Sequence, residues 1–189
     1  MLERRHVVNE LLKDRGNAVV VTGLGSPTYD VAAVSPSDRN YYLWGAMGGA
    51  AMMGLGLALA QSELHVIVIT GDGEALMGMG ALATIGTVQP PNLSIVVLDN
   101  EHYGETGMQQ SHLGMGVDLC AVAVACGLKQ ACTVTTEDEL QSSVEGFHTP
   151  GYPKLVQVKI DPETPPRVMP TRDGVENKIT FRQALGVAT

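Results

Sequence analysis

The sequence predicts an α/β fold: a single doubly wound, mainly parallel sheet with helices on both faces. Stretches with helical patterning alternate with apolar, β-branched runs, and this alternation is typical of parallel crossover units. The 189 residues are enough for one domain with a full hydrophobic core. Runs of strand length and composition occupy residues 18–22, 64–70, 93–98 and 154–160.

The first part of the chain is expected to begin with an amphipathic helix over residues 2–14, which Gly16 ends. The buried strand at 18–22 follows, and the glycines and proline of residues 23–27 break it. Residues 45–61 form an apolar helix of small residues. Gly48, Gly49, Gly54 and Gly56 lower its helix propensity, so we expect close packing against another helix or a cofactor.

The remaining elements alternate in the same way. Thr136 and Glu139 form a capping box at the start of one helix, and Gly127 ends another. From Asp161 onward four prolines indicate an extended tail with a turn near 180–185. We therefore divide the chain into a domain at 1–161 and a Pro-containing tail at 162–189, packed on the domain or on a partner. The expected helices are 75–88, 117–127 and 137–147, and a short strand lies at 131–134.

Charge and cysteine content exclude several classes of protein. The formal net charge of -8 argues against binding of nucleic acid or an anionic membrane. The charged N-terminal stretch is unlike a secretory signal, and the apolar stretch near 45–60 is too short and Gly-rich for a membrane span, so a cytoplasmic protein is expected. The three cysteines contain no CxxC pair, and Cys120 and Cys126 are expected to be buried small hydrophobes.

Two polar motifs follow neighbouring strand-like runs. Gly71-Asp72-Gly73 comes after the run 64–70, and Asn100 follows the run 93–98. In a right-handed parallel unit both carboxyl ends lie at one sheet edge, so Asp72 and Asn100 should lie side by side although 28 positions separate them. A carboxylate and an amide oxygen beside a glycine-opened helix start predict a Mg²⁺–diphosphate site.

Other interpretations of these motifs are weaker. A GDG tripeptide alone is compatible with an ordinary turn, but its position at a strand end is where open α/β sheets bind ligands. No GxxxxGK[ST] motif occurs. Gly78, Gly80 and Ala83 have the spacing of the dinucleotide-binding fingerprint, but they lie inside a predicted helix rather than directly after a strand, where that fingerprint binds the cofactor. Without a basic cluster, phosphate would have to be held by backbone N–H groups and a metal.

The motif Gly71-Asp72-Gly73, followed by Asp99-Asn100 and EHYGETGMQQSH, resembles the cofactor-diphosphate-binding (PP) domain of thiamine diphosphate-dependent enzymes. The resemblance extends to TGLGSP and YYLWGAMGGAAMMGLGLALA and covers roughly residues 17–115. Within this superfamily the segments LATIG, LDN and YGETG are most similar to the β subunits of sulfopyruvate decarboxylase and to phosphonopyruvate decarboxylase. The resemblance implies the β subunit of a thiamine diphosphate- and Mg²⁺-dependent 2-oxoacid decarboxylase, a carboxy-lyase.

The resemblance also assigns a metal site. Asp72 would bind Mg²⁺ through its carboxylate, Asn100 through its side-chain oxygen and His102 through its backbone carbonyl. Two diphosphate oxygens and a water would complete the octahedron.

The diphosphate would be held at the same edge of the sheet. Gly73 and Glu74 would donate backbone N–H groups, helped by the helix dipole. Glu74 departs from the small residue that the family often has there, so its carboxylate must point away from the phosphate. The resemblance adds Gly25, Ser26, Gly71, Tyr103 and Gly104 to the cofactor-binding set.

Residues 45–47 match the segment under the cofactor rings. The carbonyl of Gly45 would accept a hydrogen bond from the aminopyrimidine, and Met47 would wedge between the two rings and impose the bent conformer. An ordinary core methionine is the alternative for Met47. Glu105 and His112 follow the metal motif and are candidates for proton transfer to or from the substrate.

The activating glutamate of this superfamily lies in a separate Pyr domain, for which this chain has no room. A Pyr-domain (α) partner subunit is therefore implied, and it should cover residues 45–61 and 101–115. The resemblance implies a small anionic 2-oxoacid substrate such as sulfopyruvate or phosphonopyruvate. No arginine stands near the motifs in the sequence, so the partner is expected to bind the acidic group of the substrate. Two alternatives stay open: a 2-oxoacid:ferredoxin oxidoreductase β subunit, which three scattered cysteines do not favour, and a non-catalytic cofactor-binding subunit.

Overall fold

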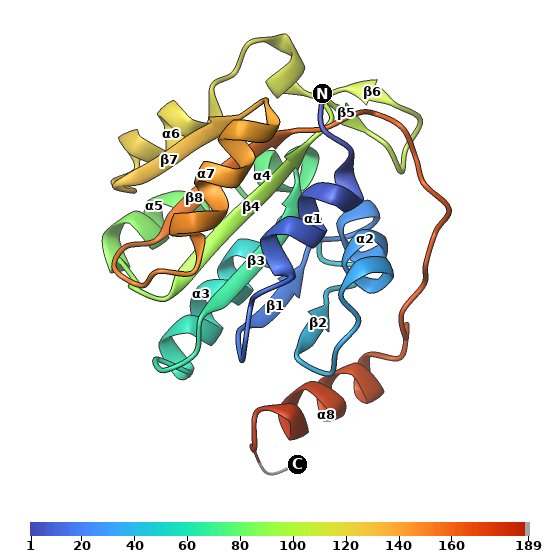
Figure 1. Cartoon of the computed structure of the whole chain (residues 1–189), viewed down its shortest axis with the longest axis vertical. Coiled ribbons are helices and arrows are strands. Elements are labelled where there is room, and N and C mark those ends of the chain that lie inside the picture. Colours follow the sequence, from blue (N-terminus) through green and yellow to red (C-terminus); the bar gives the residue numbers. More distant parts are fainter. Residues whose placement is uncertain (188–189) are drawn as a thin grey trace.

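A six-stranded sheet forms the centre of the computed structural model, which describes residues 1–187 (Figure 1). The strand order is β2-β1-β3-β4-β8-β7, and every neighbouring pair is parallel. This arrangement confirms the predicted fold class. The strands are β1 (Val19–Thr22), β2 (Asn40–Tyr42), β3 (Val66–Gly71), β4 (Leu93–Asp99), β7 (Gln130–Val134) and β8 (Lys154–Lys159).

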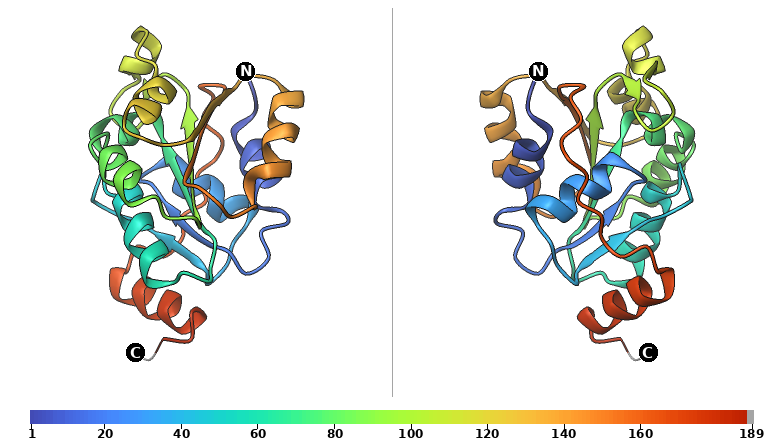
Figure 2. Two further views of the ribbon diagram at one scale, coloured as in Figure 1. Left: turned by 90° about the vertical axis from the view of Figure 1, so that its left-hand side faces the viewer. Right: turned by 90° about the vertical axis from the view of Figure 1, so that its right-hand side faces the viewer.

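Helices cover both faces of the sheet, as the two side views show (Figure 2). One face carries α1 (Arg4–Leu12), α2 (Ser26–Val34) and α7 (Glu137–Phe147). The other carries α3 (Ala50–Ala60), α4 (Asp72–Met77), α5 (Ala81–Val88) and α6 (Leu119–Ala125). The capping box of Thr136 and Glu139 at the start of α7 is confirmed.

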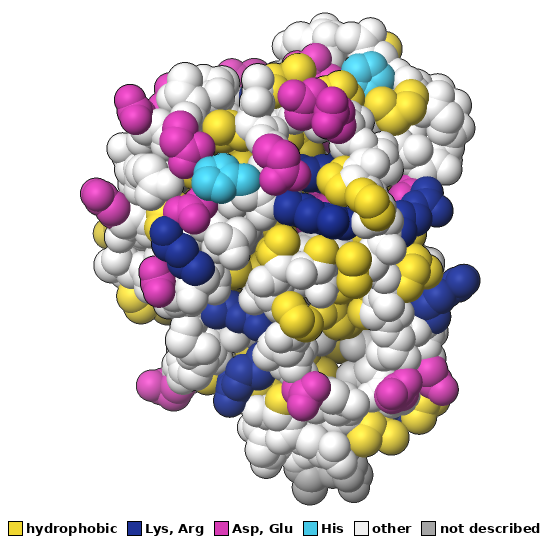
Figure 3. All heavy atoms as spheres, turned by 45° about the vertical axis from the view of Figure 1, so that its right-hand side comes forward, with side chains coloured by type: hydrophobic (Ala, Val, Ile, Leu, Met, Phe, Trp, Pro, Cys, Tyr) yellow, Lys and Arg dark blue, Asp and Glu magenta, His cyan; other side chains and the backbone are white. Residues whose placement is uncertain are grey.

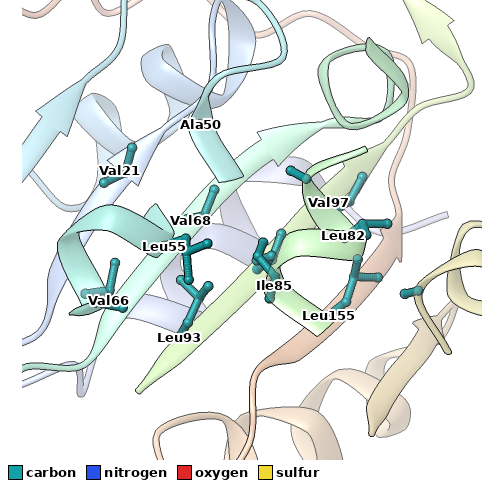
Figure 4. Packing of buried hydrophobic residues seen from close by; sticks show 14 of the residues in the cluster. Val21, Ala50, Leu55, Val66, Val68, Leu82, Ile85, Leu93, Val97 and Leu155 are labelled. Atoms are coloured by element: carbon teal, nitrogen blue, oxygen red, sulfur yellow. The ribbon is translucent and has the colours of Figure 1, made fainter. Parts of the chain in front are cut away.

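The hydrophobic core lies on both sides of the sheet because successive strand residues point to opposite faces. In β3, Val66 and Val68 pack under α3 and α5, whereas Ile67 and Ile69 pack under α1 and α2. Figure 4 shows the first of these layers, with Leu55 and Ile85 reaching down onto strand residues. Strands buried on both faces explain the continuous β-branched runs of the sequence.

The predicted helix 45–61 begins later than expected, at Ala50. Gly45 and Gly48 adopt positive φ angles of 70° and 94°, which a helix cannot contain. The close packing expected of its glycines is found at Gly48, whose Cβ would lie 3.1 Å from Gly78 N at the end of α4, and at Gly54, which faces the sheet. A Cβ atom on Gly54 would lie 2.3 Å from Cγ2 of Val68 in β3.

The predicted helix 75–88 is also wrong as a single element, because it is divided into α4 and α5. The break lies at Gly78, where a Cβ atom would be 2.2 Å from the carbonyl oxygen of Gly48. The turn before α3 thus approaches the α4–α5 break closely. Glycine is needed there for lack of space.

Two early elements were not predicted, and the tail differs from its prediction. Residues 23–27 end β1 but also start α2, which has Pro27 in its first turn, a favourable helix position. The short edge strand β2 follows. The turn expected near 180–185 is a full helix, α8 (Gly174–Ala184), whose Phe181 packs edge-on against Tyr41 of β2 with ring centroids 5.5 Å apart.

The cysteines are free, and Cys120 and Cys126 are half-buried rather than fully buried as expected. Cys132 is exposed on the edge strand β7. Within residues 1–187, every helix falls short of the length and apolar character needed to cross a bilayer.

Candidate functional site

Three neighbouring strands deliver the predicted site residues to one edge of the sheet. The register pairs Gly71 with Leu98 in β3 and β4, so Asp72 and Asn100 leave adjacent strands almost level with each other. Strand β1 ends beside them and has β2 on its other side. The chain therefore reverses its winding direction at β1, and such a switch point is where open α/β sheets bind ligands.

A cavity of about 300 Å³ lies at this edge. It is lined mostly by residues singled out from the sequence: Ser26, Met47, Gly71, Asp72, Gly73, Glu74, Asn100, His102, Tyr103, Gly104 and Glu105. Gly25, Gly45 and His112 do not line it. His112 starts the exposed 3₁₀ turn η1 (His112–Met115), so the structure gives it no contact with the cavity.

Asp72 is the first residue of α4 and is only 2% exposed. Its Oδ2 has no hydrogen-bond partner among the described residues, and neither has the hydroxyl of buried Ser111 nearby. Burial raises the pKa of Asp72 to about 6, and the charge of Asp99 acts in the same direction, while Ser111 and the N–H of Gly73 oppose the rise. A buried carboxylate with an unused oxygen is suited to a cation.

Glu74 faces backbone donors rather than open space. Its Oε2 accepts a hydrogen bond from Leu24 N at 2.7 Å, and its Oε1 accepts one from Ala50 N at 3.2 Å. A Cβ atom on Gly23 would lie 2.1 Å from Oε2. The side chain therefore joins the loop after β1 to the start of α3, and this role explains why a glutamate is found after the GDG motif.

Asn100 is held in a tight turn. Its Oδ1 accepts a hydrogen bond from His102 N at 3.0 Å, and the ring Nδ1 of His102 lies 2.8 Å from the Asn100 carbonyl oxygen. Glu101 between them has a φ of 62°, which is unusual for a residue other than glycine. The amide oxygen keeps a second lone pair for a cation.

A buried ion pair supports this turn from below. Asp99 is fully buried, and its Oδ1 accepts a hydrogen bond from Glu101 N at 2.9 Å. Its Oδ2 accepts one from Gln157 Nε2 at 2.6 Å and lies 2.7 Å from Lys159 Nζ. Burial lowers the pKa of Lys159, but hydrogen bonds and charges of Asp99 and Glu101 raise it overall. Gln157 and Lys159 alternate with buried valines in β8, and these polar residues were a signal that sequence reasoning did not use.

The hairpin of β5 (His102–Tyr103) and β6 (Gln109–Gln110) closes one side of the cavity. A Cβ atom on Gly73 would lie 2.6 Å from the ring of Tyr103 and 3.4 Å from Cε of Met47. Met47 is 38% exposed, so it is not a core methionine. Gly45 is exposed, and nothing lies within 4 Å of its missing Cβ.

The first turn of α2 forms the opposite side. Gly25, with a φ of 78°, stands at its N-cap, and no side chain caps the helix. The backbone N–H groups of Ser26 and Thr28, on either side of Pro27, therefore remain for a ligand. A Cβ atom on Gly25 would lie 2.9 Å from Cγ of Glu105. Oε2 of Glu105 in turn lies 3.1 Å from Nη2 of Arg167 in the tail.

Two arginines near the cavity were missed from the sequence. Arg4 lines the cavity, and Arg167 contacts Glu105 at its border. Both were missed because they lie far from the motifs along the chain and only folding brings them near. No arginine stands near the motifs in the sequence, and folding brings these two to the same edge of the sheet.

Comparison with known proteins agrees with the geometry. The family model "Thiamine pyrophosphate enzyme, C-terminal TPP binding domain" matches residues 23–158. The chain is 40% identical over 136 residues to sulfopyruvate decarboxylase subunit beta of Methanocaldococcus jannaschii, covering 71% of this chain and 70% of that protein. It is 39% identical over 161 residues to phosphonopyruvate decarboxylase of Streptomyces viridochromogenes, covering 85% of this chain and 39% of that protein.

A solved structure shares the fold. It is an X-ray structure assigned to the thiamin diphosphate-dependent enzymes, from Mycobacterium smegmatis, and it superposes with a TM-score of 0.73 at 21% identity. The match covers 86% of this chain and 32% of that one.

Proposed function

Because this chain belongs to the family of thiamine pyrophosphate enzymes that share the C-terminal TPP-binding domain, we propose that it is the diphosphate-holding β subunit of a Mg²⁺-dependent 2-oxoacid decarboxylase. It is an enzyme subunit of the thiamine diphosphate-dependent decarboxylase type, as its relatives are. The proposal adds the magnesium ion, the roles of individual residues, the partner and the substrate class.

The observation that carries the proposal is the cavity at the ends of β1, β3 and β4, with the unpartnered Oδ2 of Asp72 on its wall. A divalent cation would give this buried oxygen the partner that it lacks and would lower the raised pKa of Asp72. Asn100 adds a neutral oxygen whose direction is set by the turn to His102. A carboxylate with amide and carbonyl oxygens is a donor set that Mg²⁺ accepts.

The diphosphate would lie between the first turns of α2 and α4. Ser26 and the uncapped start of α2 would contact it from one side, and the N–H groups of Gly73 and Glu74 from the other. Gly73 has no room for a side chain because Tyr103 and Met47 pack against it. When bound, thiamine diphosphate supplies an electron sink for the electrons that CO₂ loss leaves behind.

Met47 would hold the cofactor rings from the mouth of the cavity, where it is partly exposed. Glu105 would be available for proton transfer to the substrate because it lines the cavity, although Arg167 engages it. His112 would reach the substrate only if the hairpin moved. We therefore rank Glu105 above His112 for that role.

A partner subunit would complete the site. Three of the relatives are named beta subunits, and on this chain exposed apolar side chains border the cavity. Met47 and Met77, which line the cavity, are 38% and 62% exposed, and Met108 in the loop of the β5–β6 hairpin is 41% exposed. A partner that supplies the activating glutamate would cover them, since Met is frequent at interfaces. Sulfopyruvate and phosphonopyruvate are the first substrates to test, by analogy with the relatives.

The test is an assay of CO₂ release from sulfopyruvate and phosphonopyruvate by the chain alone and with a Pyr-domain subunit from the same organism. Turnover should require Mg²⁺, thiamine diphosphate and both subunits, and it should not require ferredoxin. Full turnover by the chain alone would contradict the divided site. Cofactor binding without turnover in any combination would instead favour a non-catalytic subunit.

A further inference from the structure

A buried arginine lies on the wall of the cavity and has no role in the function proposed above. Arg4 comes from the first turn of α1 and is only 5% exposed. It lines the same cavity as Asp72 and Asn100. A cation placed in a largely apolar wall is unfavourable unless an anion accompanies it.

One carboxylate on α2 holds this arginine in place. Arg4 Nε donates to Oδ2 of Asp30 at 2.6 Å, and Asp30 is itself 2% exposed. Arg5 Nε donates to the other oxygen of Asp30 at 3.4 Å. Two guanidinium groups therefore share a single carboxylate, so the one negative charge of Asp30 faces two positive charges. In the space-filling view of Figure 3, Lys and Arg side chains (dark blue) lie next to Asp and Glu side chains (magenta) in the upper half of the molecule.

The end of the Arg4 side chain is available for a ligand. Among residues 1–187 its side-chain hydrogen bonds are made through Nε alone, so the terminal Nη groups have no protein acceptor. Asp30 lies four positions after Ser26 on α2, so the two residues share one face of that helix. Arg4 thus approaches the cavity from the same side as the uncapped first turn of α2.

We propose that Arg4 donates from its Nη groups to the diphosphate of the cofactor, and that Asp30 is the positioning residue that fixes the guanidinium. This inference rests on the proposed function. It assigns the phosphate a direct cationic contact besides backbone N–H groups and the metal. A planar guanidinium presents two parallel donors that match phosphate oxygens, which a lysine cannot do from the same anchor.

The test measures binding to the full-length chain by calorimetry, with Mg²⁺ and one of three probes: thiamine diphosphate, inorganic pyrophosphate or thiamine. Arg4→Gln should raise the Kd for thiamine diphosphate and for pyrophosphate by about ten- to a hundredfold, the range of a lost charge-assisted hydrogen bond. The weak binding of thiamine should not change. Arg5→Gln is the matched control, since it removes the same charge beside the same carboxylate and should change each Kd less than about threefold.

A purely structural role of Arg4 would have a different signature. If it serves only to neutralise Asp30, Arg4→Gln would lower the melting temperature without altering the preference for thiamine diphosphate over thiamine. The double variant Arg4→Gln/Asp30→Asn removes both buried charges, so Asp30 is not left as an unpaired charge that could unfold the chain. It should stay folded and still show the loss of diphosphate affinity.

Two further outcomes overturn the inference. If Arg4→Gln leaves the Kd for thiamine diphosphate unchanged but raises the KM for the oxoacid in the assembled enzyme, Arg4 binds the acidic group of the substrate instead. If the wild-type chain and its complex bind no thiamine diphosphate at all, the proposed function fails first. An unchanged Kd in Arg4→Gln beside tight wild-type binding refutes the inference alone.

Discussion

Replacement of Asp72 by asparagine should make the metal-free chain more stable at neutral pH, although it removes the main predicted metal ligand. Burial raises the pKa of this carboxyl from 3.8 to about 6. A shift of about 2 units corresponds to about 3 kcal/mol between the two protonation states. Since the folded chain disfavours the ionised form, wild type loses this free energy as the pH rises from about 4 to about 6 and beyond.

The free energy of unfolding should be measured by urea denaturation at pH 7.5 and at pH 4.0, without metal or cofactor. Asp72→Asn should exceed wild type by about 3 kcal/mol at pH 7.5 and by less than about 1 kcal/mol at pH 4.0. The urea midpoint at pH 7.5 should therefore rise by about 1 M or more. Comparing the two pH values cancels any fixed difference between the amide and the carboxyl group.

Exposed Asp38 provides the control, because Asp38→Asn should change stability by the same small amount at both pH values. Addition of Mg²⁺ and thiamine diphosphate should stabilise wild type but not Asp72→Asn. An advantage of Asp72→Asn that does not grow between pH 4.0 and 7.5 would refute the reasoning, since the carboxylate would then be ionised in the fold without cost.

Three other predictions test the packing and the site. Gly86→Ala should destabilise the chain by about 2 kcal/mol or more in chemical denaturation, since its Cβ would lie 1.9 Å from a carbonyl oxygen at the end of α6. Gly80→Ala, with open space around the added Cβ, should be nearly neutral. Equal losses of stability in the two variants would contradict the packing argument. Lys159→Met should cost about 3 kcal/mol because it leaves the fully buried Asp99 without its cation, and a loss below about 0.5 kcal/mol would show that the pair is not needed. Met47→Ala should lower turnover more than cofactor affinity, because the diphosphate anchor remains; wild-type exchange of the thiazolium C2 proton in this variant would show that Met47 does not shape the cofactor.

The closeness of the two polar motifs could be predicted because it depends on local chain order. Asp72 and Asn100 each follow a strand-like run, and parallel pairing of consecutive strands brings their ends together. The register of β3 and β4 bears out that expectation for the backbone. Glycine positions were harder to interpret, since Gly54 faces the sheet and Gly78 faces another loop. A glycine in the sequence can indicate that a side chain has no room at that position, but it does not indicate which neighbouring residue occupies the space.

Taken alone, the sequence determined the α/β class, the parallel sheet and the two polar motifs at strand ends, because the period of apolar residues and the residues that end strands are local properties. Only the tertiary structure decided which distant side chains complete the site. Arg4 lines the cavity, Arg167 contacts Glu105 at its border and Lys159 pairs with Asp99 before the Asn100 turn. Contacts between residues so distant in sequence follow from how the elements pack together. The raised pKa of Asp72 has the same origin, since burial by several elements, rather than its neighbours in sequence, sets its environment.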